Sequence, residues 1–128
     1  MEPRVRAFMV LAALDGLIAV AAGAFGAHGV SDAQVANLLR TGAQYQSIHA
    51  VAALACFSLR RVAARPAMWA GWLFSVGGAV FGLSLYLLAF SGVKVLGAIT
   101  PIGGLLLMAG WAALAWAALT ASKSHDRR

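Results

Sequence analysis

Charged residues are scarce in this chain. They make up 11% of its 128 residues, whereas soluble domains contain about 25%. Hydrophobic residues account for 62% of the sequence. A soluble protein of this size could not bury so much apolar surface, because a small domain leaves a large share of its surface in water. The composition therefore excludes a soluble globular protein and indicates a single domain that is solvated by lipid.

Cysteine is nearly absent as well. Cys56 is the only one in the sequence, which excludes an internal disulfide and a metal site built from cysteines alone. The sequence has no Gly-rich phosphate loop, no paired Cys-x-x-Cys, and no set of nucleophile, base and orienting group. We therefore expect no metal, no cofactor and no enzymatic activity.

Apolar stretches fill most of the sequence. They run over residues 5–27, 43–59, 67–90 and 95–120, and most reach the length of about 20 residues that a helix needs to cross a bilayer. The sequence predicts an all-α protein, an integral membrane four-helix bundle. A cleaved signal peptide is the alternative for the first stretch, which is longer than a typical signal core.

The segment between the first two stretches predicts an additional, shorter helix. Ser31 or Asp32 can cap its beginning, and Gly42 can end it. Apolar residues recur within it at the spacing i, i+3, i+4, so we expect a short interfacial helix that lies on the membrane surface. These apolar residues are Val35, Leu38 and Leu39.

The net charge of +6 does not indicate nucleic acid, because the basic residues stand at the ends of the apolar stretches. This placement follows the positive-inside rule and suits acidic lipid headgroups. Only Arg40 and Lys94 fall on one side, and the other eight Lys and Arg residues fall on the opposite side. We therefore expect both termini in the cytoplasm. The eight residues are Arg4, Arg6, Arg60, Arg61, Arg65, Lys123, Arg127 and Arg128.

Small residues form stripes along the predicted helices. Lipid tails do not drive helices together, so close packing in a membrane relies on small residues and hydrogen bonds. Pro101 removes one backbone hydrogen bond and crowds the carbonyl of Gly97, which Thr100 could help to satisfy. The residues expected at helix contacts are Gly23, Gly26, Gly71, Gly78, Gly82, Gly97, Pro101 and Gly104.

A few polar residues stand inside the apolar stretches. Asp15, near the middle of the first, costs about 2.5–3.5 kcal/mol on insertion, so we expect it to have a partner, and His49 is the best candidate. Ionisable groups at this depth mark functional sites by default. The alternative is a hydrogen-bond network that only fixes packing. The candidate cluster consists of Asp15, His28, Tyr45, Gln46, His49 and Thr100.

Four motifs, in order along the chain, carry a resemblance to a known family. They are GAFGAH over 23–28, TGAQYQSIHA over 41–50, FGLSLY over 81–86 and LGAITPIGG over 96–104. The chain resembles the small inner-membrane proteins of the YgdD type, a family classed under a domain of unknown function with relatives extending to eukaryotes. The resemblance implies a four-helix inner-membrane protein and no known reaction.

Two functional hypotheses follow. The first is a non-enzymatic accessory or assembly component that docks to membrane complexes or to a second copy, and for which the Gly78 and Gly82 face matters most. The alternative is a small oligomeric transporter or ligand-binding module, in which four helices would need a homo-oligomer to enclose a pathway. Its cavity would lie near Pro101 and be lined by Asp15, Tyr45, His49 and Thr100. The expected partners are the lipid bilayer and other membrane proteins or itself, and not nucleic acid.

Overall fold

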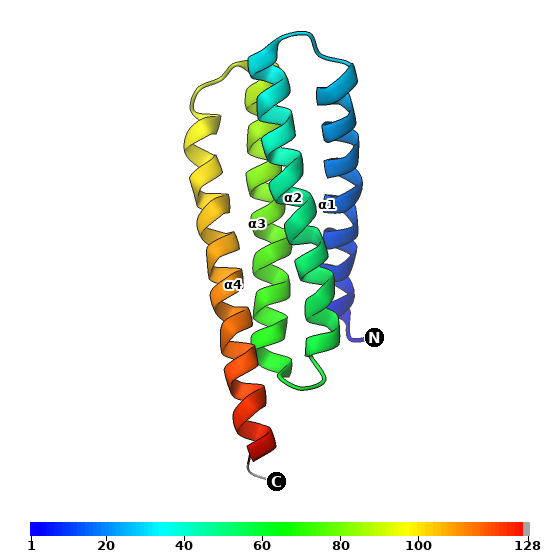
Figure 1. Cartoon of the computed structure of the whole chain (residues 1–128), viewed down its shortest axis with the longest axis vertical. Coiled ribbons are helices and arrows are strands. Elements are labelled where there is room, and N and C mark those ends of the chain that lie inside the picture. The colour runs from blue at the N-terminus through cyan, green and yellow to red at the C-terminus, as the bar shows by residue number, and fades with distance from the viewer. Residues whose placement is uncertain (127–128) are drawn as a thin grey trace.

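The computed structural model describes the backbone of residues 1–126 and the side chains of residues 1–121. The helices run alternately up and down the bundle (Figure 1). Short connections join them, and the one after α3 contains Gly92, whose φ of 69° is left-handed and suits a residue without Cβ. The helices are α1 (Pro3–His28), α2 (Ala33–Leu59), α3 (Ala64–Ser91) and α4 (Leu96–Asp126).

Within the described residues, three helices are long and apolar enough to cross a membrane: α1, α3 and the Leu96–Ala121 part of α4. The remaining helix, α2, is of similar length at 27 residues and packs against both α1 and α3. Its lower mean hydropathy reflects both the buried polar residues Gln46 and His49 and exposed ones such as Arg40 and Gln44.

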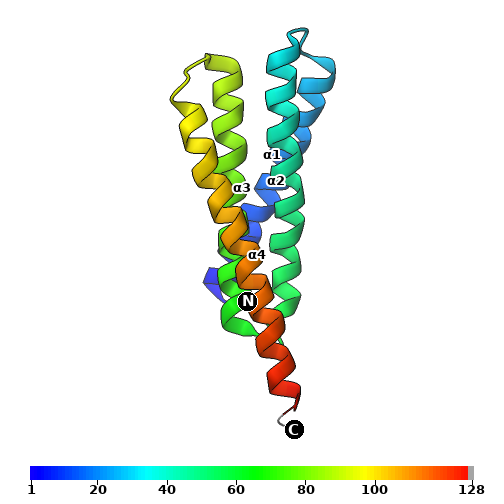
Figure 2. The ribbon, with the colours of Figure 1, turned by 60° about the vertical axis from the view of Figure 1, so that its left-hand side comes forward.

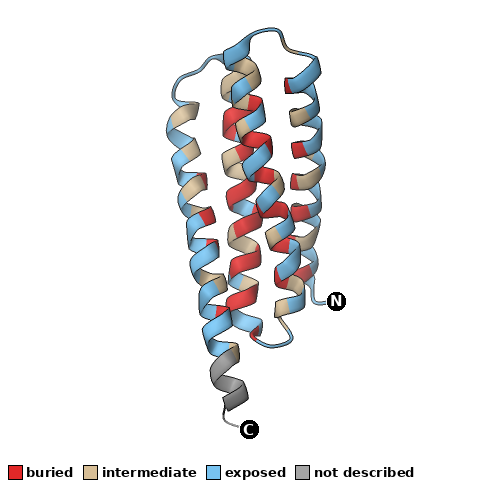
Figure 3. Ribbon diagram, in the orientation of Figure 1, coloured by how far each residue is buried: buried red, intermediate tan, exposed pale blue. Residues whose placement is uncertain are grey.

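The central helix is α3. It contacts all three other helices, whereas in the described part of the chain α1 and α4 do not contact each other and α2 meets α4 only marginally. Figure 2 shows the α1–α2 pair and the α3–α4 pair drawing apart toward the end that holds the connections after α1 and α3. Buried residues gather along α3 and on the helix faces turned toward it (Figure 3). The four helices therefore do not close around a common axis.

The predicted interfacial helix between the first two membrane helices is wrong. Residues 33–59 form one continuous helix, α2, which Asp32 caps by accepting a hydrogen bond from the Val35 amide at 2.9 Å. Gly42 lies inside α2 rather than at the end of a helix, and a Cβ there would come within 2.6 Å of the Tyr86 ring. Leu39, expected at the membrane surface, is 1% exposed. Packing against α1 and α3 extends α2 through a segment that looks amphipathic when taken alone.

Removing the cap of α2 should loosen its first turn. We expect Asp32→Ala to cost about 1 kcal/mol, because the Val35 amide loses its acceptor. Hydrogen exchange at Val35 should become faster in this variant and stay near the wild-type rate in Asp32→Asn, which keeps an acceptor oxygen. Equal exchange rates in Asp32→Ala and the wild type would contradict a role for the cap.

Glycines, which have no side chain, let α3 and its neighbouring helices approach each other closely. A Cβ on Gly71 would lie 2.8 Å from the Phe8 ring, and one on Gly103 of α4 would lie 2.6 Å from the backbone nitrogen of Phe81. The Ser75 hydroxyl on α3 donates to the Phe8 carbonyl on α1 at 3.1 Å. These contacts fix the height and rotation of α3, and with them the positions of its polar side chains.

The other glycines expected at helix contacts divide into two groups. Gly23 and Gly26 lie where α1 meets α2, and a Cβ on either would come within 3.4 Å and 3.0 Å, respectively, of a side chain on α2. Gly97 would gain only an ordinary contact at 3.7 Å, and Gly104 would gain none within 4 Å. The α4 seam therefore depends on Gly103 rather than on its neighbour Gly104.

Candidate functional site

Side chains from three helices meet in the middle of the bundle. Asp15 of α1 is 1% exposed. The Gln46 amide nitrogen of α2 donates to Asp15 Oδ1 at 2.9 Å, and the Tyr86 hydroxyl of α3 donates to Gln46 Oε1 at 2.7 Å. Both hydrogen bonds are buried and point in the same direction, toward the carboxyl group. We call Asp15, Gln46 and Tyr86 the polar trio.

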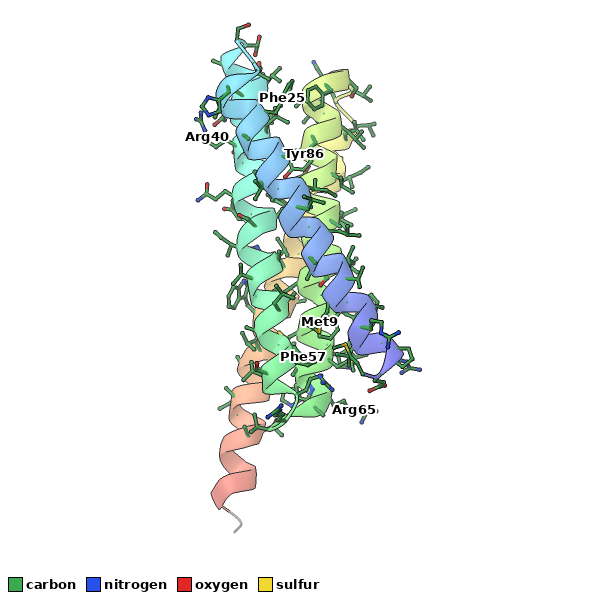
Figure 4. The ribbon with its side chains drawn as sticks, turned by 90° about the vertical axis from the view of Figure 1, so that its right-hand side faces the viewer. Met9, Phe25, Arg40, Phe57, Arg65 and Tyr86 are labelled. Carbon is green, nitrogen blue, oxygen red and sulfur yellow. The ribbon has the colours of Figure 1, made fainter. Side chains whose placement is uncertain are left out.

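Glycines make room for each member of the polar trio. A Cβ on Gly42 would lie 2.6 Å from the tyrosine ring, and one on Gly82 would lie 2.8 Å from the glutamine Oε1. Gly78 faces the carboxyl group, with Asp15 Oδ2 at 3.5 Å from the position of its Cβ. Figure 4 shows Tyr86 in the space between α3 and the α1–α2 pair. Packing of this kind excludes a Cβ at Gly42 and Gly82, whereas a Cβ at Gly78 would make only an ordinary contact with the carboxyl group.

The carboxyl group keeps one oxygen without a partner. Asp15 Oδ2 is buried and accepts no hydrogen bond, although buried polar atoms are nearly always paired. The expected partner, His49, does not reach it, and Gln46 takes that role. Although Gln46 and His49 are only one turn apart on α2, their side chains meet different neighbours: Gln46 bonds to Asp15 of α1, and His49 to Trp111 of α4.

Hydrogen bonds fix His49 in one tautomer. The Trp111 indole nitrogen of α4 lies 3.0 Å from His49 Nε2, and the Tyr45 carbonyl lies 2.6 Å from His49 Nδ1. An indole N–H can only donate, so Nε2 accepts, and Nδ1 carries the proton that it donates to the carbonyl. The ring also packs against Phe74, with centroids 5.7 Å apart. His49 is therefore a neutral residue that joins α2 to α4, with both of its nitrogens in use.

A groove of about 490 Å³ lies beside His49, between α2 and α4. Gly104 lines it and has no atom of another residue's side chain near its Cβ position, so the missing side chain widens the groove. Tyr45 lines the groove, is 45% exposed, and packs against Phe81 with ring centroids 4.8 Å apart and the rings tilted by 35°. The apolar part of the lining is Pro101, Leu105, Leu107 and Met108.

Two members of the expected cluster stand apart from these features. The Thr100 hydroxyl pairs with Ser84 at 2.7 Å and donates to the Leu96 carbonyl at 3.4 Å, rather than to the Gly97 carbonyl that Pro101 was expected to free. His28 is exposed at the end of α1. The six expected residues therefore separate into the polar trio, the groove beside His49, a seam between α3 and α4, and one surface histidine.

Comparison with known proteins places the chain among membrane proteins. Residues 22–104 match the family described as "Protein of unknown function (DUF423)". A UPF0382 membrane protein of Staphylococcus epidermidis is 39% identical over 117 residues, which cover 89% of this chain and 96% of that protein. The chain therefore belongs to the DUF423 family. A UPF0382 membrane protein of Haemophilus influenzae is 40% identical over 85% of this chain and 90% of its own length, and YwdK of Bacillus subtilis is 34% identical over 89% and 97%. No solved structure matches the chain.

The match to the DUF423 family contains most of the site. Gln46, His49 and Tyr86 lie within residues 22–104, whereas Asp15 and Trp111, to which two of them bond, lie outside. The relatives carry only the description of membrane proteins. Family membership therefore supports the membrane location, and any activity has to be argued from the geometry.

Two residues of the site were not assigned to it from the sequence. The sequence did contain a signal for each of them. Tyr86 is a polar residue within an apolar stretch, and Trp111 falls on the same helical face as Gly104. Neither signal says which neighbouring helix the side chain meets. That information depends on the rotation of α3 and α4, which Gly71 and Gly103 set through their contacts with Phe8 and Phe81.

Proposed function

We propose that this protein is a non-enzymatic, ligand-binding membrane protein whose groove between α2 and α4 holds a lipid-like molecule. The observation that carries the proposal is the groove itself. Its volume of about 490 Å³ lies within the range of about 300–1,000 Å³ found for small-molecule sites. Such sites are mostly apolar with a few polar groups that orient the ligand, and this groove has the same composition.

The chemistry of the lining indicates the class of ligand. Leucine, methionine and proline side chains of α4 form one wall, which suits a hydrocarbon chain. Both nitrogens of His49 are already bonded, so that side chain positions Tyr45 and Trp111 rather than a ligand. The Tyr45 hydroxyl, which has no partner within the described residues, remains to bond a ligand. We therefore expect a long apolar molecule with a single hydrogen-bonding head.

Filling the groove should remove the ligand. A leucine at Gly104 would meet no atom near its Cβ and would extend into the groove, so we expect Gly104→Leu to fold and to lose bound ligand at least about tenfold, which is about 1.4 kcal/mol. Native mass spectrometry of the gently extracted protein measures this as the fraction that carries a discrete extra mass.

The matched control is Gly16→Leu. Gly16 of α1 also has no atom within 4 Å of its Cβ position, but it does not line the groove. This variant should keep the extra mass at the wild-type level. If Gly104→Leu retains the mass as well as Gly16→Leu does, the ligand lies elsewhere and the proposal fails.

A non-enzymatic accessory role in membrane complexes is the second candidate. The open side of the bundle favours it, because α1 and α4 do not contact each other within the described residues and α4 leaves its outer face exposed. The Gly78 and Gly82 face is occupied by Asp15 and Gln46 of the same chain, so it is not free to dock a partner. The same spectra distinguish the candidates: an additional protein subunit favours the accessory role, and a small mass favours the ligand.

A further inference from the structure

The polar trio has no part in the proposed groove. The geometry points to Asp15 as a proton-binding site inside the membrane, with the proton on Oδ2 and with Gln46 and Tyr86 as positioning residues. Asp15 Oδ2 is a buried acceptor without a partner, while Oδ1 is already bonded to Gln46. The step transfers one proton from hydronium to the carboxylate: an O–H bond of the hydronium breaks and leaves its electron pair on the released water, and an O–H bond forms on Oδ2.

Tyr86 determines how the Gln46 amide is oriented. Because the Tyr86 hydroxyl donates to Oε1, the amide nitrogen must face the carboxyl group, where it donates to Oδ1. The amide therefore cannot accept a proton from Asp15 at that oxygen. Oδ2 is left as the oxygen that gains or loses the proton, and the facing residue, Gly78, brings no side chain that could compete.

No other charged group neutralises this carboxyl group within the described residues. On α2, His49 bonds to Trp111 and Tyr45, and Cys56 donates to the Ala52 carbonyl. On α3, Tyr86 is the titratable group that faces Asp15, and α4 does not contact α1. A hard metal ion would need about six oxygen ligands, and only one carboxyl oxygen is free here. A proton is the cation that this site fits.

Infrared spectroscopy of the full chain in lipid vesicles tests the site. We expect a C=O stretch of a protonated carboxyl group that disappears as the pH is raised, and that is missing in Asp15→Asn. Labelling aspartate with ¹³C in the wild type should shift the same band, which identifies it even if the variant does not fold. A spectrum with no pH-dependent band from a buried aspartate would overturn the proposal.

The positioning role needs a separate comparison. Tyr86→Phe frees the Gln46 amide to rotate, so we expect the midpoint of the carboxyl transition to move by about one pH unit, a tenfold change in proton affinity. The control is Ser47→Ala, which removes from α2 a hydroxyl that donates only to the Gln44 carbonyl, outside the polar trio and the groove, and should leave the midpoint unchanged. A purely structural role for Tyr86 would lower stability without moving the midpoint, and that result would overturn its assignment as a positioning residue.

Discussion

Gly103→Ala is expected to lower the free energy of unfolding by about 3 kcal/mol, near the upper end of the range for overpacked sites. The added Cβ would lie 2.6 Å from the nitrogen, 2.8 Å from Cα and 2.9 Å from Cβ of Phe81. The first two atoms belong to the backbone of α3, so no rotation of a side chain relieves the overlap. The two helices would have to separate along a seam that contains most of the packing of α4. Equilibrium unfolding in mixed detergent micelles measures the change.

The adjacent glycine provides the control for this prediction. Gly104→Ala adds the same atom to the same helix where no other atom lies within 4 Å. Because alanine favours a helix by about 1 kcal/mol over glycine, we expect stability equal to or above that of the wild type. Equal losses in both variants would mean that α4 tolerates no alanine in this turn for reasons of backbone conformation, and the close approach to Phe81 would not be the cause.

Gln46→Leu is expected to destabilise the protein by about 2 kcal/mol, because it leaves two buried groups without partners at once. Asp15 Oδ1 would lose its donor and the Tyr86 hydroxyl its acceptor. Hydrogen bonds between membrane helices average only about 0.6 kcal/mol. The larger part of the effect should therefore come from the buried carboxylate oxygen and hydroxyl that are left without hydrogen-bond partners. The same unfolding measurement applies, and Gln44→Leu, an exposed glutamine of α2, should be near neutral.

Removing the whole polar trio separates its contribution to helix packing from its role in binding a proton. Asp15→Leu, Gln46→Leu and Tyr86→Phe combined leave no unpaired group, and replacing all partners by apolar groups of similar shape can be nearly neutral. We expect the triple variant to be more stable than Gln46→Leu alone. That result would show that stability does not require a carboxyl group at this depth. Stability of the triple variant below that of Gln46→Leu would instead assign the trio to packing.

The sequence predicts the features that depend on local chemistry. Apolar stretches of membrane length became α1, α3 and α4, because the length that a helix needs in lipid is set by the bilayer. Asp32 was one of two expected caps, and it bonds to the amide three residues ahead. The signal at Gly42 was ambiguous, because a glycine that ends a helix and one that receives a ring from another helix look alike in the sequence.

The partner of Asp15 could not be found in this way. From the sequence, possible partners of Asp15 can be compared only by their depth in the membrane, and the depths of Gln46 and His49 differ by only one helical turn. The choice between them depends on how α2 is rotated, and α2 presents Gln46 to α1 and His49 to Trp111 of α4. The adjacent pair Gly103 and Gly104 poses the same problem, because only one of them can face Phe81. Rotation is a property of the packed helices and leaves little trace in one sequence.

The spacing of the polar trio along the chain has a consequence for biogenesis. Gln46 follows Asp15 by 31 residues, and Tyr86 follows Gln46 by 40. Synthesis proceeds from the amino terminus at about 5–20 residues per second, so the carboxyl group is made before either of its partners. It meets its amide when α2 arrives, and the hydroxyl that orients this amide comes only with α3. The nascent α1–α2 hairpin thus carries an incompletely satisfied interior until the central helix joins it, and α4 arrives last with Trp111 and Thr100, the partners of His49 and Ser84.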